Sequence, residues 1–290
     1  MIKSRTLNLG LVGLMILFTL LTIGAAFSGE QTQNLQSFVS LRGETVMLYG
    51  KGIYGNEATD YALQAIAQDI VTLFLGIPML IYGAVSKSLR GRAVLVGGLS
   101  YFLYTYVSYC FLLQFNQLFL AYVALMSLSF FGLWYNLRDL KSERVKAVLE
   151  PVLNRKVYAV FQWLLALMLA AMWLARIVPT FWGDFSKIQL AHYNTAVIQV
   201  LDLGFIVPLA SLSGYWLWRQ MPMGYLLTLT LMIKGAALGT ALLAMIVMAF
   251  LNGSAISIVE CLVFAFLIGG IDILAFRLFV KIPAQDTVVH

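Results

Sequence analysis

The sequence predicts an all-α fold, a polytopic integral membrane bundle of about eight transmembrane helices, and three observations predict it. Hydrophobic residues make up 61% of the 290 residues and charged residues 11%, whereas an ordinary soluble domain has about 25% charged residues. The apolar residues gather into about eight runs, each near the roughly 20 residues that a helix needs to cross a bilayer. The runs lack the alternation of polar and apolar residues that strands of a membrane barrel require.

The predicted spans cover residues 7–27, 62–85, 93–113, 118–137, 157–178, 193–218, 224–251 and 255–280. A charged segment, 138–156, separates the fourth span from the fifth and has the alternating charges of a short surface helix. We therefore expect an N-terminal transmembrane half (1–137), a basic cytoplasmic linker (138–156) and a C-terminal transmembrane half (157–290).

Basic residues indicate the orientation of the chain. Most of the 19 lysine and arginine residues lie on one side if the N-terminus is cytoplasmic, as the positive-inside rule requires. An even number of spans then returns the C-terminus to the cytoplasm. We therefore expect a multi-pass protein of the cell membrane with both termini in the cytoplasm. The expected partner is the lipid bilayer, and nucleic acid is not indicated, because the positive charge follows the loops. The oligomeric state stays open.

The first run also resembles a secretory signal, because small residues follow it at positions 24–26. We expect it to be retained as an anchor, because its loss would break a duplication within the chain. Gln199 and Asp202 precede Pro208 by nine and six residues, and Asp69 and Thr72 precede Pro78 by the same nine and six. With four spans in each half, the matching placement predicts two parallel four-helix repeats.

Ionisable side chains within the spans are the candidate functional residues. Each costs at least about 2.5 kcal/mol at the bilayer centre, so such residues face the bundle interior and have a partner or a function. Lys234 and Asp272 lie at depths that allow them to meet, and Asp202 lies within reach of a lysine side chain. A structural salt bridge or a protonated aspartate is the alternative interpretation. The candidates for ligand binding or ion coupling are Asp202, Lys234, Asp272, Asp69, Gln199, Glu260, Tyr104 and Asn116.

Two outer features accompany these residues. Segment 28–61 is the longest segment outside the cytoplasm, and it is interpreted either as a folded interfacial loop or as a lid over a site. The third run carries tyrosines at positions 101, 104, 106 and 109. Their hydroxyls need hydrogen-bond partners within the bundle or in a polar vestibule that opens outward.

No metal or cofactor is predicted. His192 and His290 are the two histidines, which are too few for a haem or metal site between helices. Cys110 and Cys261 match no zinc or redox motif, and a disulfide between them is left open.

The leading hypothesis is a membrane transporter or ligand-binding membrane protein for a small molecule or ion, with a central polar site between the halves. One alternative is a membrane-embedded enzyme acting on a lipid or isoprenoid, which is disfavoured because no Ser-His pair or His-Glu-x-x-His motif is present. The other is a structural subunit of a membrane complex, which predicts no internal pocket. A cavity that reaches Asp202 would separate the first two hypotheses from the third.

Overall fold

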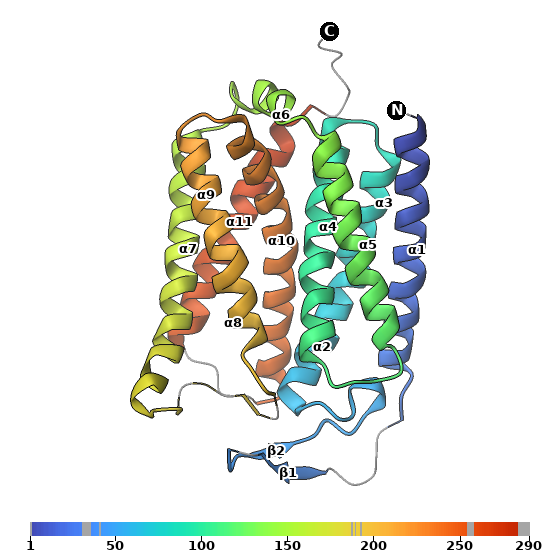
Figure 1. Ribbon diagram of the computed structural model, residues 1–290, viewed down its shortest axis with the longest axis vertical. Helices are drawn as coiled ribbons and strands as arrows, with labels where there is room; N and C mark the ends of the chain where they lie inside the picture. The colour runs from blue at the N-terminus through green and yellow to red at the C-terminus, as the bar shows by residue number, and fades with distance from the viewer. Residues whose placement is uncertain are drawn as a thin grey trace.

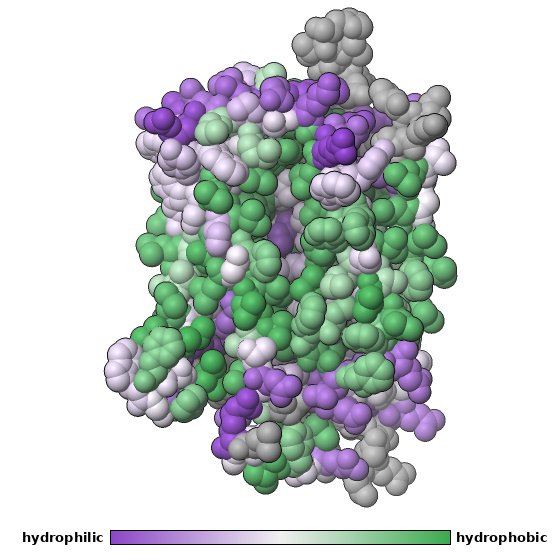
Figure 2. Space-filling view, in the orientation of Figure 1, coloured by the Kyte–Doolittle hydropathy of each residue, from purple (hydrophilic) through white to green (hydrophobic). Residues whose placement is uncertain are grey.

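The computed structural model describes residues 2–30, 36–40, 42–186, 188, 190–191, 193–253 and 258–283, with side chains from residue 5 onward and without that of Glu260. Within these ranges, eight helices are long and apolar enough to cross a membrane. Each overlaps one predicted span, which confirms the helical part of the prediction. Hydrophobic side chains cover the middle of the bundle and hydrophilic ones gather at both ends (Figure 2), as expected for a multi-pass membrane protein.

The first half consists of four membrane-length helical spans that pack against one another in a ring. It contains α1 (Ile2–Phe27), α2 (Thr59–Val71), α3 (Ile77–Val85), α4 (Leu89–Leu112) and α5 (Phe119–Asp139). The helices α2 and α3 belong to one span, because a π-helical segment joins them without interruption. In this group α1 packs against α3 and α5, and α4 packs against the same two helices.

The second half has the same order of packing. It contains α7 (Arg155–Ile177), α8 (Val197–Leu201), α9 (Val207–Trp218), α10 (Pro222–Leu251) and α11 (Ile258–Lys281). Here α9 packs against α7 and α10, and α11 packs against the same two helices. The halves meet where α10 contacts α2 and α4, and where α4 contacts α8 (Figure 1).

The two ends of the bundle differ. At one end lies α6 (Ser142–Leu149), the helix expected in the linker, with Val145 and Leu149 fully buried against the ends of the spans. At the other end lies a small antiparallel hairpin of β1 (Ser37–Val39) and β2 (Thr45–Met47). We call these the α6 end and the hairpin end. The helix α1 begins and α11 ends at the α6 end (Figure 1).

The hairpin departs from the all-α prediction. Phe38 pairs with Val46, and Gly43 in the connecting turn has a φ of 82°. Short stretches of apolar and β-branched residues favour strands, and glycine adopts positive φ without steric cost. Segment 28–61 is therefore a folded loop in the part that the structure describes.

Both proline-containing spans contain a π-helical segment at the same place. One covers Thr72–Gly76 and ends two residues before Pro78, and the other covers Asp202–Ile206 and ends two residues before Pro208. Proline lacks the N–H that an α-helix needs, and a π-helical turn accommodates the interruption while the helix continues. The two-repeat interpretation stays a prediction, which this shared placement favours.

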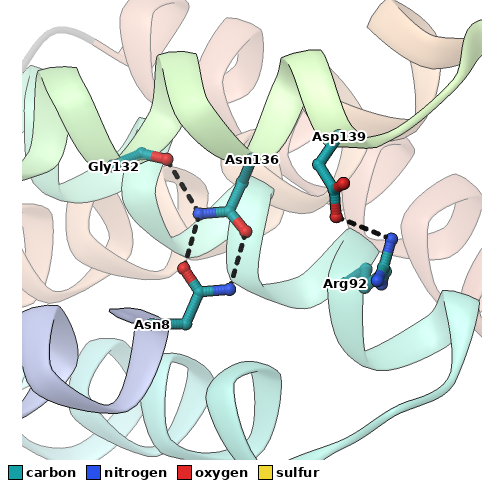
Figure 3. Close-up of polar contacts among 5 residues, drawn as sticks. All are labelled: Asn8, Arg92, Gly132, Asn136 and Asp139. Carbon is teal, nitrogen blue, oxygen red and sulfur yellow. Dashed lines mark hydrogen bonds and ion pairs between the residues drawn. The ribbon is translucent and has the colours of Figure 1, made fainter. Parts of the chain in front are cut away.

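A buried amide pair joins α1 to α5 near the α6 end. The side chains of Asn8 and Asn136 donate to each other at 3.0 Å in both directions, and Asn136 also donates to the carbonyl oxygen of Gly132 at 2.8 Å (Figure 3). Next to them, Arg92 and Asp139 form an ion pair at 3.0 Å. The amide pair ties α1 to the first half, and the ion pair ties α4 to α5.

Replacing either asparagine of this pair by leucine is expected to lower the free energy of unfolding by about 0.5–2 kcal/mol, because the remaining amide loses its partner between helices. The double variant Asn8→Leu with Asn136→Leu is expected to recover part of that loss, since no amide is then left unpaired. A double-mutant cycle measured by unfolding in mixed micelles tests this. Additive losses would contradict a direct pair.

Candidate functional site

Asp202 is held between the two halves by two neutral donors. It stands at the start of the π-helical segment that joins α8 to α9 and is 8% exposed. The hydroxyl of Tyr104 on α4 donates to Oδ1 at 2.8 Å, and the indole Nε1 of Trp173 on α7 donates to Oδ2 at 2.9 Å. Each carboxyl oxygen therefore has a donor, and the site joins helices of both halves.

Lys234 lies beside this group on α10. Its ammonium nitrogen is 4.3 Å from the centroid of the Tyr104 ring, a cation–π contact, and the residue is 6% exposed. Within the described part of the chain, no hydrogen bond or ion pair joins this ammonium to another side chain or carbonyl. Tyr104 thus contacts both charged residues, with its ring facing Lys234 and its hydroxyl bonded to Asp202.

These three residues line a central cavity of about 420 Å³. A wider chamber of about 1180 Å³ lies next to it at the hairpin end, where β2, α2 and the segment before α8 form its walls. The two cavities share wall residues, including Tyr61, Gln64, Met172, Trp173, Arg176 and Met245. We call the wider one the hairpin-end chamber, and the shared walls place it directly outside the central cavity.

Charged residues surround the hairpin-end chamber. Glu44, Asp60 and Arg176 line it, and so does Gln199, one of the predicted site residues. The guanidinium carbon of Arg176 lies 5.2 Å from the centroid of the Trp173 ring. Trp173 therefore lines both the polar chamber and the central cavity, and its indole N–H donates to Asp202.

The loops of the two halves are tied together beside this chamber. Arg42 donates to the carbonyl oxygens of Tyr193 at 2.9 Å and Ala191 at 3.4 Å, and the Tyr193 hydroxyl donates to Glu57 at 2.6 Å. Burial, and then the charge of Glu57, raises the pKa of Tyr193 well above its ordinary value. The hydroxyl therefore keeps its proton at neutral pH and donates to the carboxylate.

Asp69 forms a separate cluster inside the first half. It is 1% exposed and accepts hydrogen bonds from Tyr54 at 2.7 Å and Tyr109 at 2.9 Å. Burial raises the pKa of Tyr54, which lies outside the spans, well above its ordinary value, so its hydroxyl stays protonated. Asp69 lines neither cavity, but Tyr109 lines the central one.

The other two tyrosines of α4 belong to neither of these groups. The hydroxyl oxygen of Tyr101 accepts a hydrogen bond from the side-chain amide of Gln68 at 2.6 Å and is also bonded to the hydroxyl of Thr72 at 2.9 Å, within the first half. Tyr106 is fully buried, and its hydroxyl has no hydrogen-bond partner among the described residues. Of the four tyrosines, Tyr104 and Tyr109 therefore line the central cavity, and Tyr104 is the one bonded to Asp202 in the described part of the chain.

Two further predicted site residues lie outside the central cavity. Asp272 is partly exposed on α11 and lines neither cavity, and no ion pair joins it to Lys234 in the described part of the chain. The preceding Ile271 faces Gly235 of α10, and one helical step turns Asp272 away from that contact. Asn116 caps the turn before α5 by accepting from the backbone N–H of Leu118 at 2.9 Å. The side chain of Glu260 lies outside the described residues.

Sequence reasoning missed Trp173, Arg176 and Tyr54 as members of these clusters. Tryptophan, tyrosine and arginine are common near membrane interfaces, so their residue types alone carried no signal. Trp173 reaches a carboxyl 29 positions away in sequence. His192 lies outside the described residues, and Cys110 and Cys261 are free.

Replacing Tyr104 by phenylalanine is expected to lower the free energy of unfolding by about 1–3 kcal/mol, because Oδ1 of Asp202 loses its donor in a buried site. The ring stays in place for Lys234. Tyr106→Phe is the matched control, since it removes a buried hydroxyl without a partner among the described residues and should be close to neutral. Thermal unfolding of both variants measures the difference. Equal effects would contradict the hydrogen bond to Asp202.

Comparison with known proteins adds no family to this description. No protein-family model, no curated protein and no solved structure matches the chain.

Proposed function

We propose that this protein binds a small molecule in the central cavity and moves it across the membrane. The observation that carries the proposal is the pair of adjoining cavities, which lead from the hairpin end to Asp202 and Lys234 between the halves. Ligand sites in membrane transporters lie near the bilayer midplane, where two halves meet. A volume of about 420 Å³ falls within the range of about 300–1,000 Å³ that ligand pockets occupy.

The opposite end is closed by apolar packing. Val145 and Leu149 of α6, Leu217 of α9 and Leu278 of α11 are each at most 1% exposed, and they belong to one buried cluster. A transport cycle therefore needs a second conformation in which this cluster opens. Asp202 and Ile206, the two ends of one π-helical segment, both line the central cavity, and this segment is a place where the helix can rearrange.

The orientation is part of the proposal. The protein is oriented in the cell membrane with the α6 end and both termini facing the cytoplasm, and the positive-inside bias of the sequence supports this orientation. The chamber then opens to the outside. Two parallel four-helix repeats account for the matched π-helical segments and for the same order of packing in each half.

The alternatives are less well supported. A structural subunit would have no internal pocket, whereas the central cavity reaches Asp202. An enzyme acting through two carboxyl groups would need both at the cavity, but Asp272 does not line it and both oxygens of Asp202 already accept hydrogen bonds. No observation in the described residues favours catalysis.

The test compares molecules that the purified protein retains, identified by mass spectrometry. Leu238→Trp enlarges a side chain of the central cavity, and Leu120→Trp makes the same change at a position 76% exposed on the outside of the bundle. A molecule held by the wild type and Leu120→Trp but lost from Leu238→Trp supports the site. Uptake of that molecule into proteoliposomes then tests transport. If all three proteins retain only the same bulk lipids, the proposal is wrong.

A further inference from the structure

The ammonium of Lys234 has donors that nothing in the described part of the chain uses. A lysine ammonium carries three N–H donors, and the face of the Tyr104 ring supplies a cation–π contact but no hydrogen-bond acceptor of the ordinary kind. The nearest acidic group in the site, Asp202, is bonded by Tyr104 and Trp173. A buried charge without hydrogen bonds is costly, so the site is incomplete without an acceptor.

The charges on the wall of the central cavity favour an anion. Lys234 carries positive charge there, and both oxygens of Asp202, an acidic residue on this wall, already accept hydrogen bonds. Arg176 lines this cavity too, and it also lines the hairpin-end chamber together with Glu44 and Asp60. An anionic ligand would therefore complement Lys234, and its acidic oxygens would accept from the unused donors of the ammonium.

The rest of the cavity is apolar. Beyond the polar group its wall is formed by side chains of α7, α10 and α11, including Leu165, Leu169, Leu238, Leu242, Phe264 and Leu267. Burying apolar ligand surface against such a wall stabilises a complex by about 25 cal/mol for each Å² removed from water. A small hydrophilic anion would leave this wall unused, whereas an amphiphile would cover it.

We propose that the ligand is a single-chain amphiphile with one anionic head group, a carboxylate or a phosphate monoester, held by Lys234 with its apolar chain along α7 and α11. This inference rests on the proposed function, because it names the chemical class of the ligand for the same cavity. The head group enters from the hairpin-end chamber and passes Arg176 and Trp173 before it reaches Lys234. The volume of about 420 Å³ suits one alkyl chain.

The test is titration of the full chain in lipid nanodiscs with three probes of the same chain length, dodecanoate, dodecyl phosphate and dodecylamine. Empty nanodiscs correct for partition into lipid. We expect at least one of the two anions to bind the wild type at least tenfold more tightly than dodecylamine does. Preference for dodecanoate or for dodecyl phosphate then identifies the head group.

Variants of Lys234 test whether this residue binds the head group of the ligand. Lys234→Met is expected to weaken binding of the anion at least tenfold, while Lys234→Arg keeps a cationic donor and should stay within about threefold of the wild type. A purely structural lysine would give the same affinity in folded Lys234→Met. That result would overturn the assignment.

The remaining outcomes separate this inference from the proposed function. If dodecylamine binds most tightly and Asp202→Asn removes its binding, the cavity is a ligand site but its ligand is a cation, and the inference is wrong. If no probe binds and Leu238→Trp changes no retained molecule, the ligand site itself is wrong.

Discussion

Leucine at position 97 is expected to force the two halves apart and to abolish the central site. Gly97 lies on α4 and faces α10, and a Cβ atom added there would overlap the side chain of Ile233 and lie 3.3 Å from the backbone nitrogen of Lys234. Overpacking a well-packed interior costs about 1–3 kcal/mol for small additions, and leucine adds several atoms. The contact cannot be relieved by one flexible side chain, because backbone stands directly behind it.

The adjacent glycine supplies the control. A Cβ at Gly98 would lie 3.3 Å from the side chain of Leu80 and 3.5 Å from that of Met79, which belong to α3 rather than to α10. Gly98→Ala should therefore leave the junction of the halves intact. Thermal unfolding and retention of the wild-type ligand measure both variants and Gly97→Leu. Wild-type values for Gly97→Leu would contradict the close approach of α4 and α10.

The sequence predicted the spans well because hydropathy decides them. Each run of about 20 apolar residues has only one way to satisfy its backbone inside a membrane, as a helix. The short helix α6 followed from alternating charges in the linker. The hairpin of β1 and β2 was missed, since three-residue strands leave too little pattern to separate them from a loop.

The candidate site was predicted in part. Asp202, Lys234 and Tyr104 were named because polar groups inside a span need partners, and the structure brings these three together. Asp272 was placed near Lys234 from depth alone, but depth does not determine the face of a helix. Trp173 was missed because its partner is set by the packing of α7 against α9, which no local pattern encodes.

The two prolines also show that local sequence does not determine how a helix packs and bends. Pro78 and Pro208 each lack a backbone N–H donor, so a break in the helical hydrogen bonding is expected in each of these two spans. The structure resolves each break as a five-residue π-helical segment that keeps the helix continuous. Sequence reasoning identifies where a hydrogen bond is lost, whereas the neighbouring helices decide how the backbone accommodates the loss.

Asp69→Leu is expected to destabilise the first half strongly. It leaves the hydroxyl of Tyr54 without its carboxyl acceptor in a core where Asp69 is 1% exposed, whereas the hydroxyl of Tyr109 keeps the carbonyl oxygen of Ala65 at 3.0 Å as an acceptor. An unsatisfied buried donor costs about 1–3 kcal/mol, so the expected loss is about 1–3 kcal/mol of unfolding free energy. Asp69→Asn keeps one acceptor oxygen and should lose about half as much or less. Unfolding in mixed micelles measures both variants.

Hydrogen exchange in the segment before α2 distinguishes the Asp69 cluster from the ligand site. Tyr54 anchors the 3₁₀ turn Gly52–Tyr54 to the bundle through Asp69, so Asp69→Leu should speed hydrogen exchange of that turn. Asp202→Asn should leave the exchange unchanged, because Asp202 bonds only Tyr104 and Trp173 in the described part of the chain. Asp69→Asn should also keep the ligand preference of the wild type. A stable Asp69→Asn protein that loses the ligand would instead join Asp69 to the central cavity through Tyr109, and the two clusters would then form one site.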